Sequence, residues 1–269
     1  MTEATDCLVP LRATGDRTPV YCVHPVSGSP YVYAGLAKLL GDDQPVYGFE
    51  APGFDNDRPL TATLLDLARE YVDVVRAHRP GPAVLLGWSM GGSVAYEMAQ
   101  LLTAAGEPVP LVVVIDSAVP EGFGSPSEPW MVHRFLLDLA AISGLTVEGL
   151  DEIAAALPAD VDAHAVFERV EAAGMFPEEV DASFLADRYQ VFRTHVRALY
   201  SHTVTPGYAG PLLLIKATGS QQEYLHWERF AAAVTEYTIE GDHHSLWTGD
   251  RLNLMAEIIS AHLDRSFRQ

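Results

Sequence analysis

Short apolar runs alternate with longer amphipathic segments along the first 115 residues of the chain. Apolar runs of strand length lie at 19–24, 45–49, 83–86 and 111–115. The segments at 31–40, 64–75 and 93–105 instead repeat their apolar residues at helical spacing. The run at 111–115 is apolar at every position, as in a strand that is buried on both faces. This order predicts an α/β fold, with a mostly parallel sheet flanked by helices.

The alternation stops at residue 121, and no convincing strand follows before residue 205. Helical periodicity continues in this stretch, over 131–142, 163–172 and 184–200. The strand pattern resumes at 211–217, a last strand is predicted at 237–240, and an amphipathic segment closes the chain at 252–263. We therefore predict a single domain over 1–269 that carries a helical lid insertion at 121–205. Such a block, placed over the carboxyl ends of the strands, would cover a site there.

The amino-acid composition restricts which partners the protein can bind and which cellular compartment it suits. The 269 residues carry a formal net charge of −19 and are 48% hydrophobic, which fits one large globular domain. The acidic balance argues against nucleic acid or an anionic membrane as the main partner, because both require a basic protein surface. We expect no signal peptide in residues 1–19, because they lack an apolar core, and no apolar run approaches the ~20 residues of a membrane span. With two cysteines, a buried Cys22 and a Cys7 in a loose terminus, we predict a cytoplasmic protein without disulfides.

The stretch Gly87-Trp88-Ser89-Met90-Gly91 follows an apolar run and precedes a helical segment. A G-x-S-x-G pattern between a strand and a helix is typical of a nucleophile elbow. The glycines allow the strand and helix backbones to pass close to the turn. The turn would leave the Ser89 hydroxyl exposed above the sheet, beside the N–H groups that open the helix. The alternative is a plain strand-to-helix turn with an N-capping serine.

A serine nucleophile needs a base and a carboxylate that orients the base. His243 is the predicted base, because it lies between the last strand and the closing helix, and His244 is the adjacent competitor. The usual place for the acid, the loop after the 211–217 strand, contains no carboxylate. Asp116 ends the preceding strand of the sheet, where a carboxylate is costly without a partner such as an imidazole. We predict Asp116 as the acid; a turn-capping role for it, or Asp242 as the acid, are the alternatives.

Two backbone N–H groups are predicted to form an oxyanion hole. Met90 directly follows the serine and supplies one of them. Val26 lies in the first strand-to-helix loop and supplies the other. We expect no metal ion at this site.

Five short stretches of the chain carry a resemblance when they are taken together. They are His24-Pro25-Val26-Ser27-Gly28, Val46-Tyr47-Gly48 with Pro52-Gly53, Gly87-Trp88-Ser89-Met90-Gly91-Gly92 with Ala95-Tyr96-Glu97, Ile115-Asp116-Ser117, and Gly241-Asp242-His243. In this order they resemble the thioesterase domains of nonribosomal peptide and polyketide synthases, over most of the chain outside the insertion. The chain-releasing type is the closer match, ahead of the discrete editing type.

The resemblance implies an α/β-hydrolase fold with a helical lid. It implies that Ser89 attacks a thioester on the phosphopantetheine arm of an acyl or peptidyl carrier protein, so that this chain binds no cofactor of its own. The resulting acyl-enzyme would be released by water, or by a nucleophile within the acyl chain in a macrocyclisation. The family's acid follows the same strand as Asp116. The acyl group, the release mode, and whether the chain is a separate protein or the end of a synthase stay open.

Two other classes of protein compete with this interpretation. A carboxylesterase or lipase of the same fold would act on compact oxygen esters and would need no carrier. A non-catalytic binding module that kept the fold is disfavoured by three intact triad positions.

A carrier protein that is itself acidic can dock on this chain only through a local basic or apolar patch. Arg193 and Arg197 share one face of the predicted 184–200 helix and are the predicted docking pair. Arg188 lies about 140° from Arg193 around the helix and points elsewhere. The alternative is that the pair forms salt bridges with acids of the insertion such as Glu178 or Asp187.

Overall fold

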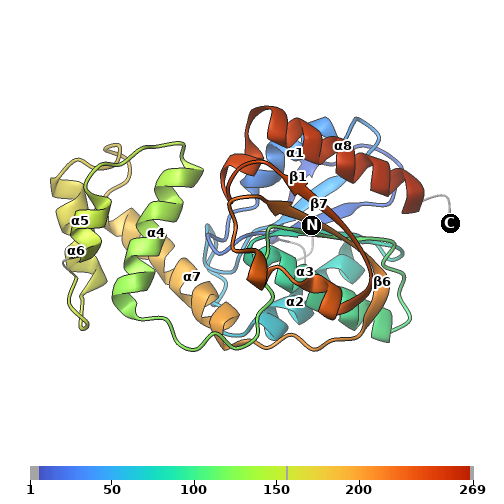
Figure 1. The fold of residues 1–269 in the computed structure, drawn as a ribbon, viewed down its shortest axis with the longest axis horizontal. Helices are drawn as coiled ribbons and strands as arrows, with labels where there is room; N and C mark the ends of the chain where they lie inside the picture. The colour runs from blue at the N-terminus through green and yellow to red at the C-terminus, as the bar shows by residue number, and fades with distance from the viewer. Residues whose placement is uncertain (1–5, 156, 267–269) are drawn as a thin grey trace.

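The computed structural model describes residues 6–155 and 157–266, and these form an α/β sandwich around one sheet (Figure 1). Within the described residues, seven strands pair in the order β1-β3-β2-β4-β5-β6-β7, with β1 antiparallel to β3 and the other pairs parallel. The strands are β1 Leu8–Arg12, β2 Val20–Val23, β3 Val46–Phe49, β4 Val84–Trp88, β5 Val112–Ile115, β6 Tyr208–Ala217 and β7 Ala231–Ile239. The mostly parallel sheet predicted from the sequence is therefore confirmed.

Helices cover both faces of this sheet. The helices are α1 Ala34–Leu39, α2 Leu64–His78, α3 Met90–Ala104, α4 Glu128–Ile142, α5 Leu150–Ala155, α6 Ala163–Ala172, α7 Ala182–Ser201 and α8 Gly249–Ser266. Figure 1 shows α1 and α8 on one face and α2 and α3 on the other. Successive residues of β5 join opposite cores: Val112 and Val114 pack on the α2 and α3 side, and Val113 on the α1 and α8 side. This two-sided burial explains why the strand is apolar at every position.

Two edge strands depart from the sequence-based expectation. β1 was not predicted, and its pairing with β3 places Cys7, which was expected in a loose terminus, in a buried position with 2% exposure. β7 begins at Ala231, six residues before the predicted start at 237. Most of its residues are exposed or half-buried, because it lies at the edge of the sheet, and its apolar start is interrupted by Thr235 and Glu236. Hydrophobic patterning reports burial, and an edge strand buries little.

The helices α4–α7, which we call the insertion helices, lie between β5 and β6 in the chain. Figure 1 shows them gathered beside the sheet, with α7 running back toward it. α4 starts three residues earlier than predicted, because Ser127 caps its first turn and Pro129 occupies a position where no N–H is needed. In the described residues between 121 and 205, the one β-type pairing is an isolated bridge between Glu121 and Thr203. Among the described helices, none has the length and hydropathy to cross a bilayer.

The turn from β4 into α3 brings three backbone segments into unusually close contact. Ser89 occupies a left-handed conformation, with φ 56° and ψ −131°. A Cβ atom on Gly87 would lie 2.0 Å from the carbonyl carbon of Gly91, and one on Gly91 would lie 2.2 Å from the carbonyl oxygen of Val23. Only glycine at both positions allows α3 to start this close to β4 and β2.

We predict that Gly91→Ala destabilises the fold severely, because the added methyl group meets backbone oxygen that cannot rotate away. The free energy of unfolding should fall by about 3 kcal/mol or more. The matched control is Gly106→Ala, which also adds one methyl group but has nothing within 4 Å of it and a φ of 76°. The control should cost about 1–2 kcal/mol from its backbone conformation alone. Urea unfolding of both variants tests the prediction, and equal losses would contradict it.

Candidate active site

A pocket of about 580 Å³ opens at the carboxyl ends of the central strands, between the sheet and the insertion helices. Its walls include Ser89 after β4, Asp116 after β5 and His243 after β7. Val26 and Met90, the predicted oxyanion donors, line the same pocket. The structure thus brings together all five residues that the sequence indicated as candidates for one site.

Ser89 is the first of these groups, and its position follows from the tight turn described above. Its backbone N–H donates to the carbonyl of Ile115 over 3.0 Å, which ties the turn to the end of β5. Its side-chain hydroxyl has no hydrogen-bond partner among the described residues and faces the pocket. The hydroxyl does not cap α3, contrary to the alternative of a simple N-capping serine.

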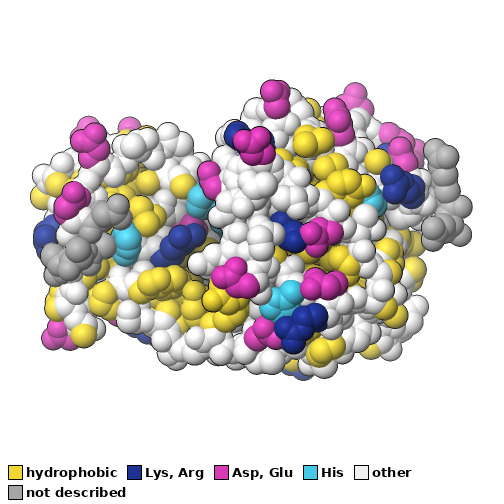
Figure 2. Space-filling view, viewed as in Figure 1, with side chains coloured by type: hydrophobic (Ala, Val, Ile, Leu, Met, Phe, Trp, Pro, Cys, Tyr) yellow, Lys and Arg dark blue, Asp and Glu magenta, His cyan; other side chains and the backbone are white. Residues whose placement is uncertain are grey.

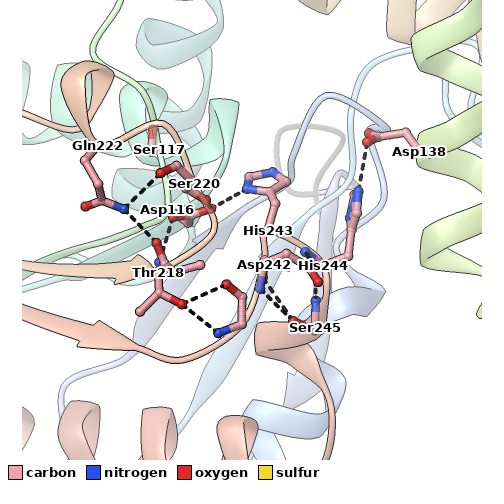
Figure 3. A network of polar contacts seen from close by, with 12 residues as sticks. Asp116, Ser117, Asp138, Thr218, Ser220, Gln222, Asp242, His243, His244 and Ser245 are labelled. Carbon is pink, nitrogen blue, oxygen red and sulfur yellow. Dashed lines mark hydrogen bonds and ion pairs between the residues drawn. The ribbon is translucent and has the colours of Figure 1, made fainter.

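Asp116 is a buried carboxylate, 3% exposed, in a left-handed conformation with φ 43°. Its Oδ1 accepts the backbone N–H of Ala217 at 2.9 Å. Its Oδ2 accepts the Ser220 hydroxyl at 2.6 Å and His243 Nδ1–H at 2.6 Å (Figure 3). Burial alone would raise the pKa of Asp116, but the hydrogen bond and charge of His243, aided by the other donors, bring the pKa below its ordinary value. Asp116 is therefore an ionised acceptor that faces His243.

His243 is held in place by its two neighbours in the pocket. Its Nδ1 contacts Asp116, and its ring packs on Trp88 with centroids 4.7 Å apart. Asp242, the alternative acid, accepts the backbone N–H groups of His244 and Ser245, each at 3.0 Å, so its carboxylate closes the turn (Figure 3). The competitor His244 points the other way, toward α4, where its Nε2 lies 3.2 Å from Asp138.

The loop that carries Val26 is held by two buried histidines. Pro25 C=O accepts His24 Nδ1–H at 2.8 Å, and Val26 C=O accepts His195 Nδ1–H from α7 at 2.9 Å. Both rings must carry the proton on Nδ1, because a carbonyl only accepts. This tautomer leaves His24 Nε2 free to accept the Tyr71 hydroxyl at 2.6 Å. The two imidazoles stack with centroids 4.9 Å apart.

Comparison with known proteins identifies the family of the chain. The family model for the thioesterase domain matches residues 18–263. The chain belongs to the thioesterase domain family. Its recognition from five short stretches of sequence is thereby confirmed.

The curated relatives are long synthetases of which this chain covers a small part. The chain is 41% identical over 151 residues to a dimodular nonribosomal peptide synthase of Bacillus subtilis (strain 168), which is 56% of this chain and 6% of that protein. It is 40% identical over 116 residues to malpinin synthetase of Mortierella alpina, which is 43% of this chain and 2% of that protein.

Solved structures support the same fold. A four-domain nonribosomal peptide synthetase aligns over 95% of this chain and 20% of its own, with a TM-score of 0.81 and 24% identity. The NocB thioesterase domain, bound covalently to a fluorophosphonate nocardicin G analogue, aligns over 95% of this chain and 99% of its own. The TM-score is 0.69 and the sequence identity is 22%. YbtT, a type II thioesterase from the yersiniabactin pathway, aligns over 97% of this chain and 99% of its own. The TM-score is 0.72 and the sequence identity is 19%.

The predicted docking arginines are paired within the insertion helices. Arg193 Nε lies 2.9 Å from a carboxylate oxygen of Glu128, and an Arg197 nitrogen lies 3.1 Å from the other oxygen. Their partner is thus Glu128 and not Glu178 or Asp187, which lie closer in sequence. The alternative that the pair forms salt bridges with an acid of the insertion therefore holds, although the acid is Glu128. The docking role of the two arginines stays a prediction without support from their geometry.

Three polar side chains of the site had weak or no signals in the sequence. Ser220 lies in the loop after β6 that lacks a carboxylate, and it donates to Asp116 instead of replacing it. Asp138 and His195 come from the insertion helices α4 and α7, which have no motif of their own. In the described ranges, no group of three or more His, Cys, Asp or Glu side chains is arranged to hold a metal ion.

We predict that the free energy of unfolding decreases below pH 6.5 partly because of His195. Burial lowers the pKa of His195 from 6.5 to about 4. Between these two pH values His195 is protonated in the unfolded chain and neutral in the folded chain. The stabilisation is complete above pH 6.5 and is lost toward pH 4, by about 3 kcal/mol in all. Urea unfolding at pH 7 and pH 4.5 should show a smaller loss for His195→Gln than for the wild type. Equal losses in the two proteins would contradict the prediction.

Proposed function

We propose that this chain is a serine thioesterase that releases an acyl, peptidyl or polyketide chain from the phosphopantetheine thioester of a carrier protein. The observation that carries the proposal is the contact of 2.6 Å between His243 and a buried, ionised Asp116, in a pocket that also exposes the Ser89 hydroxyl. A base oriented by a carboxylate next to an unpartnered serine is the arrangement needed for nucleophilic attack on an acyl group. Membership of the thioesterase domain family supports a substrate in which the acyl group is carried as a thioester.

The chemistry follows from the proton positions in the pocket. Asp116 holds the proton of His243 on Nδ1, which leaves Nε2 as the atom that takes the proton of Ser89. Ser89 Oγ then attacks the thioester carbonyl, and collapse of the tetrahedral intermediate expels the thiol of the carrier arm with the proton from His243. The acyl group stays on Ser89 until water, or a nucleophile within the acyl chain, repeats the step. The second route gives a macrocycle.

The N–H groups of Val26 and Met90 are the proposed donors to the oxyanion. Neither donates to another described backbone group, and both residues line the pocket. A planar trans peptide points its N–H opposite to its C=O, so the bonds from His24 and Gly28 to Pro25 C=O direct the Val26 N–H. His195 fixes the next peptide in the same way, which makes it a proposed positioning residue. Donors fixed before the reaction stabilise the developing charge without reorganisation.

A discrete editing thioesterase is a second candidate, because the structural neighbours include both a synthetase domain and a type II thioesterase. The acyl or peptidyl carrier protein is the proposed partner in both cases, and the phosphopantetheine belongs to that carrier. A cytoplasmic location stays a proposal.

The covalent step can be observed directly by intact mass spectrometry. After exposure to acyl N-acetylcysteamine thioesters, the wild type should gain the mass of the acyl group on Ser89. Ser89→Ala should show no adduct and should lose turnover by a factor on the order of 10⁶, with an unchanged unfolding transition. Preferred hydrolysis of the matching oxygen esters would instead indicate a carboxylesterase.

The acid is tested by comparing two neighbouring carboxylates. Asp116→Asn should lower kcat by roughly 10⁴, because His243 would lose the partner that selects its tautomer. Asp242→Asn is the matched control, since Asp242 closes a turn and does not contact the His243 ring. A larger loss in Asp242→Asn than in Asp116→Asn would refute the assignment.

A further inference from the structure

Four aromatic side chains form one wall of the pocket, and no part of the proposed chemistry uses them. They are Phe123, Trp130, Tyr200 and Tyr224. Phe123 contacts Tyr200 and Tyr224, with ring centroids 5.4 and 5.8 Å apart, and Trp130 contacts Tyr200 at 5.4 Å. The rings come from four separate segments, namely the β5–α4 connection, the first turn of α4, the end of α7 and the loop after β6. We call them the aromatic wall.

The aromatic wall is unusually open for a set of large apolar side chains. Phe123 is 36% exposed, Trp130 40% and Tyr224 41%. Among the exposed large hydrophobic residues of the described chain, these are the three that line the pocket with Ser89. Figure 2 shows hydrophobic side chains gathered where the insertion helices meet the sheet domain. An apolar surface of this kind, concentrated in one place, is typical of a binding site.

Backbone hydrogen bonds hold segments of the wall together. The N–H of Gly122 donates to His202 C=O at the end of α7, over 3.0 Å. The N–H of Val119 donates to Tyr224 C=O over 2.7 Å, and Val204 N–H donates to Pro120 C=O over 2.9 Å. These bonds join three of the four contributing segments. A ligand would therefore lose little affinity to the ordering of the wall.

The polar groups near the wall restrict the chemistry of its ligand. Glu128 is paired with Arg193 and Arg197. Asp138 lies 3.2 Å from His244 and 3.9 Å from Arg134, which also lines the pocket. The hydroxyls of Tyr200 and Tyr224 have no hydrogen-bond partner among the described residues. The wall itself thus offers ring faces and edges, together with two hydroxyls, to a planar group.

We propose that the aromatic wall is a specificity subsite for an aromatic group carried on the acyl chain. The inference rests on the proposed thioesterase function, because it assigns the part of the pocket that would hold the chain while its carbonyl lies at Ser89. Offset and edge-to-face contacts between aromatic rings add to the energy of simple apolar burial, so an aryl group gains more here than an alkyl group of equal size. The occupant is the acyl chain and not the carrier protein, since the rings line the same pocket as the nucleophile.

Binding to an inert protein tests the subsite without any need for turnover. In a Ser89→Ala background, the Kd of 3-phenylpropanoyl N-acetylcysteamine thioester should be about tenfold lower than that of the 3-cyclohexylpropanoyl thioester. Adding Trp130→Ala and Tyr224→Ala should remove this preference, whereas Trp130→Phe with Tyr224→Phe should keep most of it. Both positions are exposed, so these changes should leave the unfolding transition in place. Tyr31→Ala is the matched control, an aromatic residue that is 57% exposed and does not line the pocket.

Kinetics of the protein with Ser89 intact separate the subsite from the general function. Trp130→Ala with Tyr224→Ala should lower kcat/KM for the phenylpropanoyl thioester about tenfold and change that of the butanoyl thioester less than twofold. The same ratios should hold when each acyl group is presented on a carrier protein. Equal Kd values for the phenyl and cyclohexyl thioesters would overturn the subsite. So would a loss of kcat/KM that depends on the presence of the carrier protein and not on the acyl group. Aryl-selective binding to a protein that never forms an acyl-enzyme would support the subsite and overturn the proposed function.

Discussion

Close contact between backbones at the β4–α3 turn is the constraint on which the rest of the site depends. Gly91 lies against Val23 C=O and Gly87 against Gly91, so the helix can begin directly over two adjacent strands. That approach forces Ser89 into a left-handed conformation and ties its N–H to Ile115 at the end of β5. Because β5 ends there, the next residue is Asp116, and the serine and the carboxylate reach one pocket from neighbouring strands. A methyl group on either glycine would separate them.

Asp116, His24 and His195 are buried polar residues near this turn, and each has hydrogen-bond partners. Asp116 receives three donors, and its ionised form is favoured although it is almost fully enclosed. His24 and His195 stay neutral because burial lowers the pKa of each imidazole. Neutral rings donate to carbonyls without introducing a charge, which is the cheaper way to fix a loop inside a core. The site therefore combines the buried charge of Asp116 with the uncharged histidines that hold the loop of Val26.

The sequence predicted those features that depend on local patterns. Continuous apolar runs identified the central strands, and the G-x-S-x-G stretch identified the turn, because both patterns reflect burial or close contact within a few residues. Edge strands β1 and β7 were missed or shortened, since an edge buries too little to leave a pattern. The partner of Arg193 and Arg197 was missed because Glu128 lies about 65 positions away in the chain and meets them only through the packing of α4 on α7. Ser220 and His195 act through single contacts that no spacing rule encodes.

The bond from His195 to Val26 has a consequence for evolution and for protein engineering. Insertions of this kind look exchangeable, because they begin and end beside strands and carry few motifs. Here, however, the imidazole of His195 on α7 donates to the carbonyl of Val26, which lies in the loop between β2 and α1. A chimaera that replaced residues 121–205 would leave that carbonyl buried without a donor, unless the new helix supplied an imidazole or amide at the same place. Single substitutions along the pocket wall leave this contact in place, whereas exchange of the whole segment removes it.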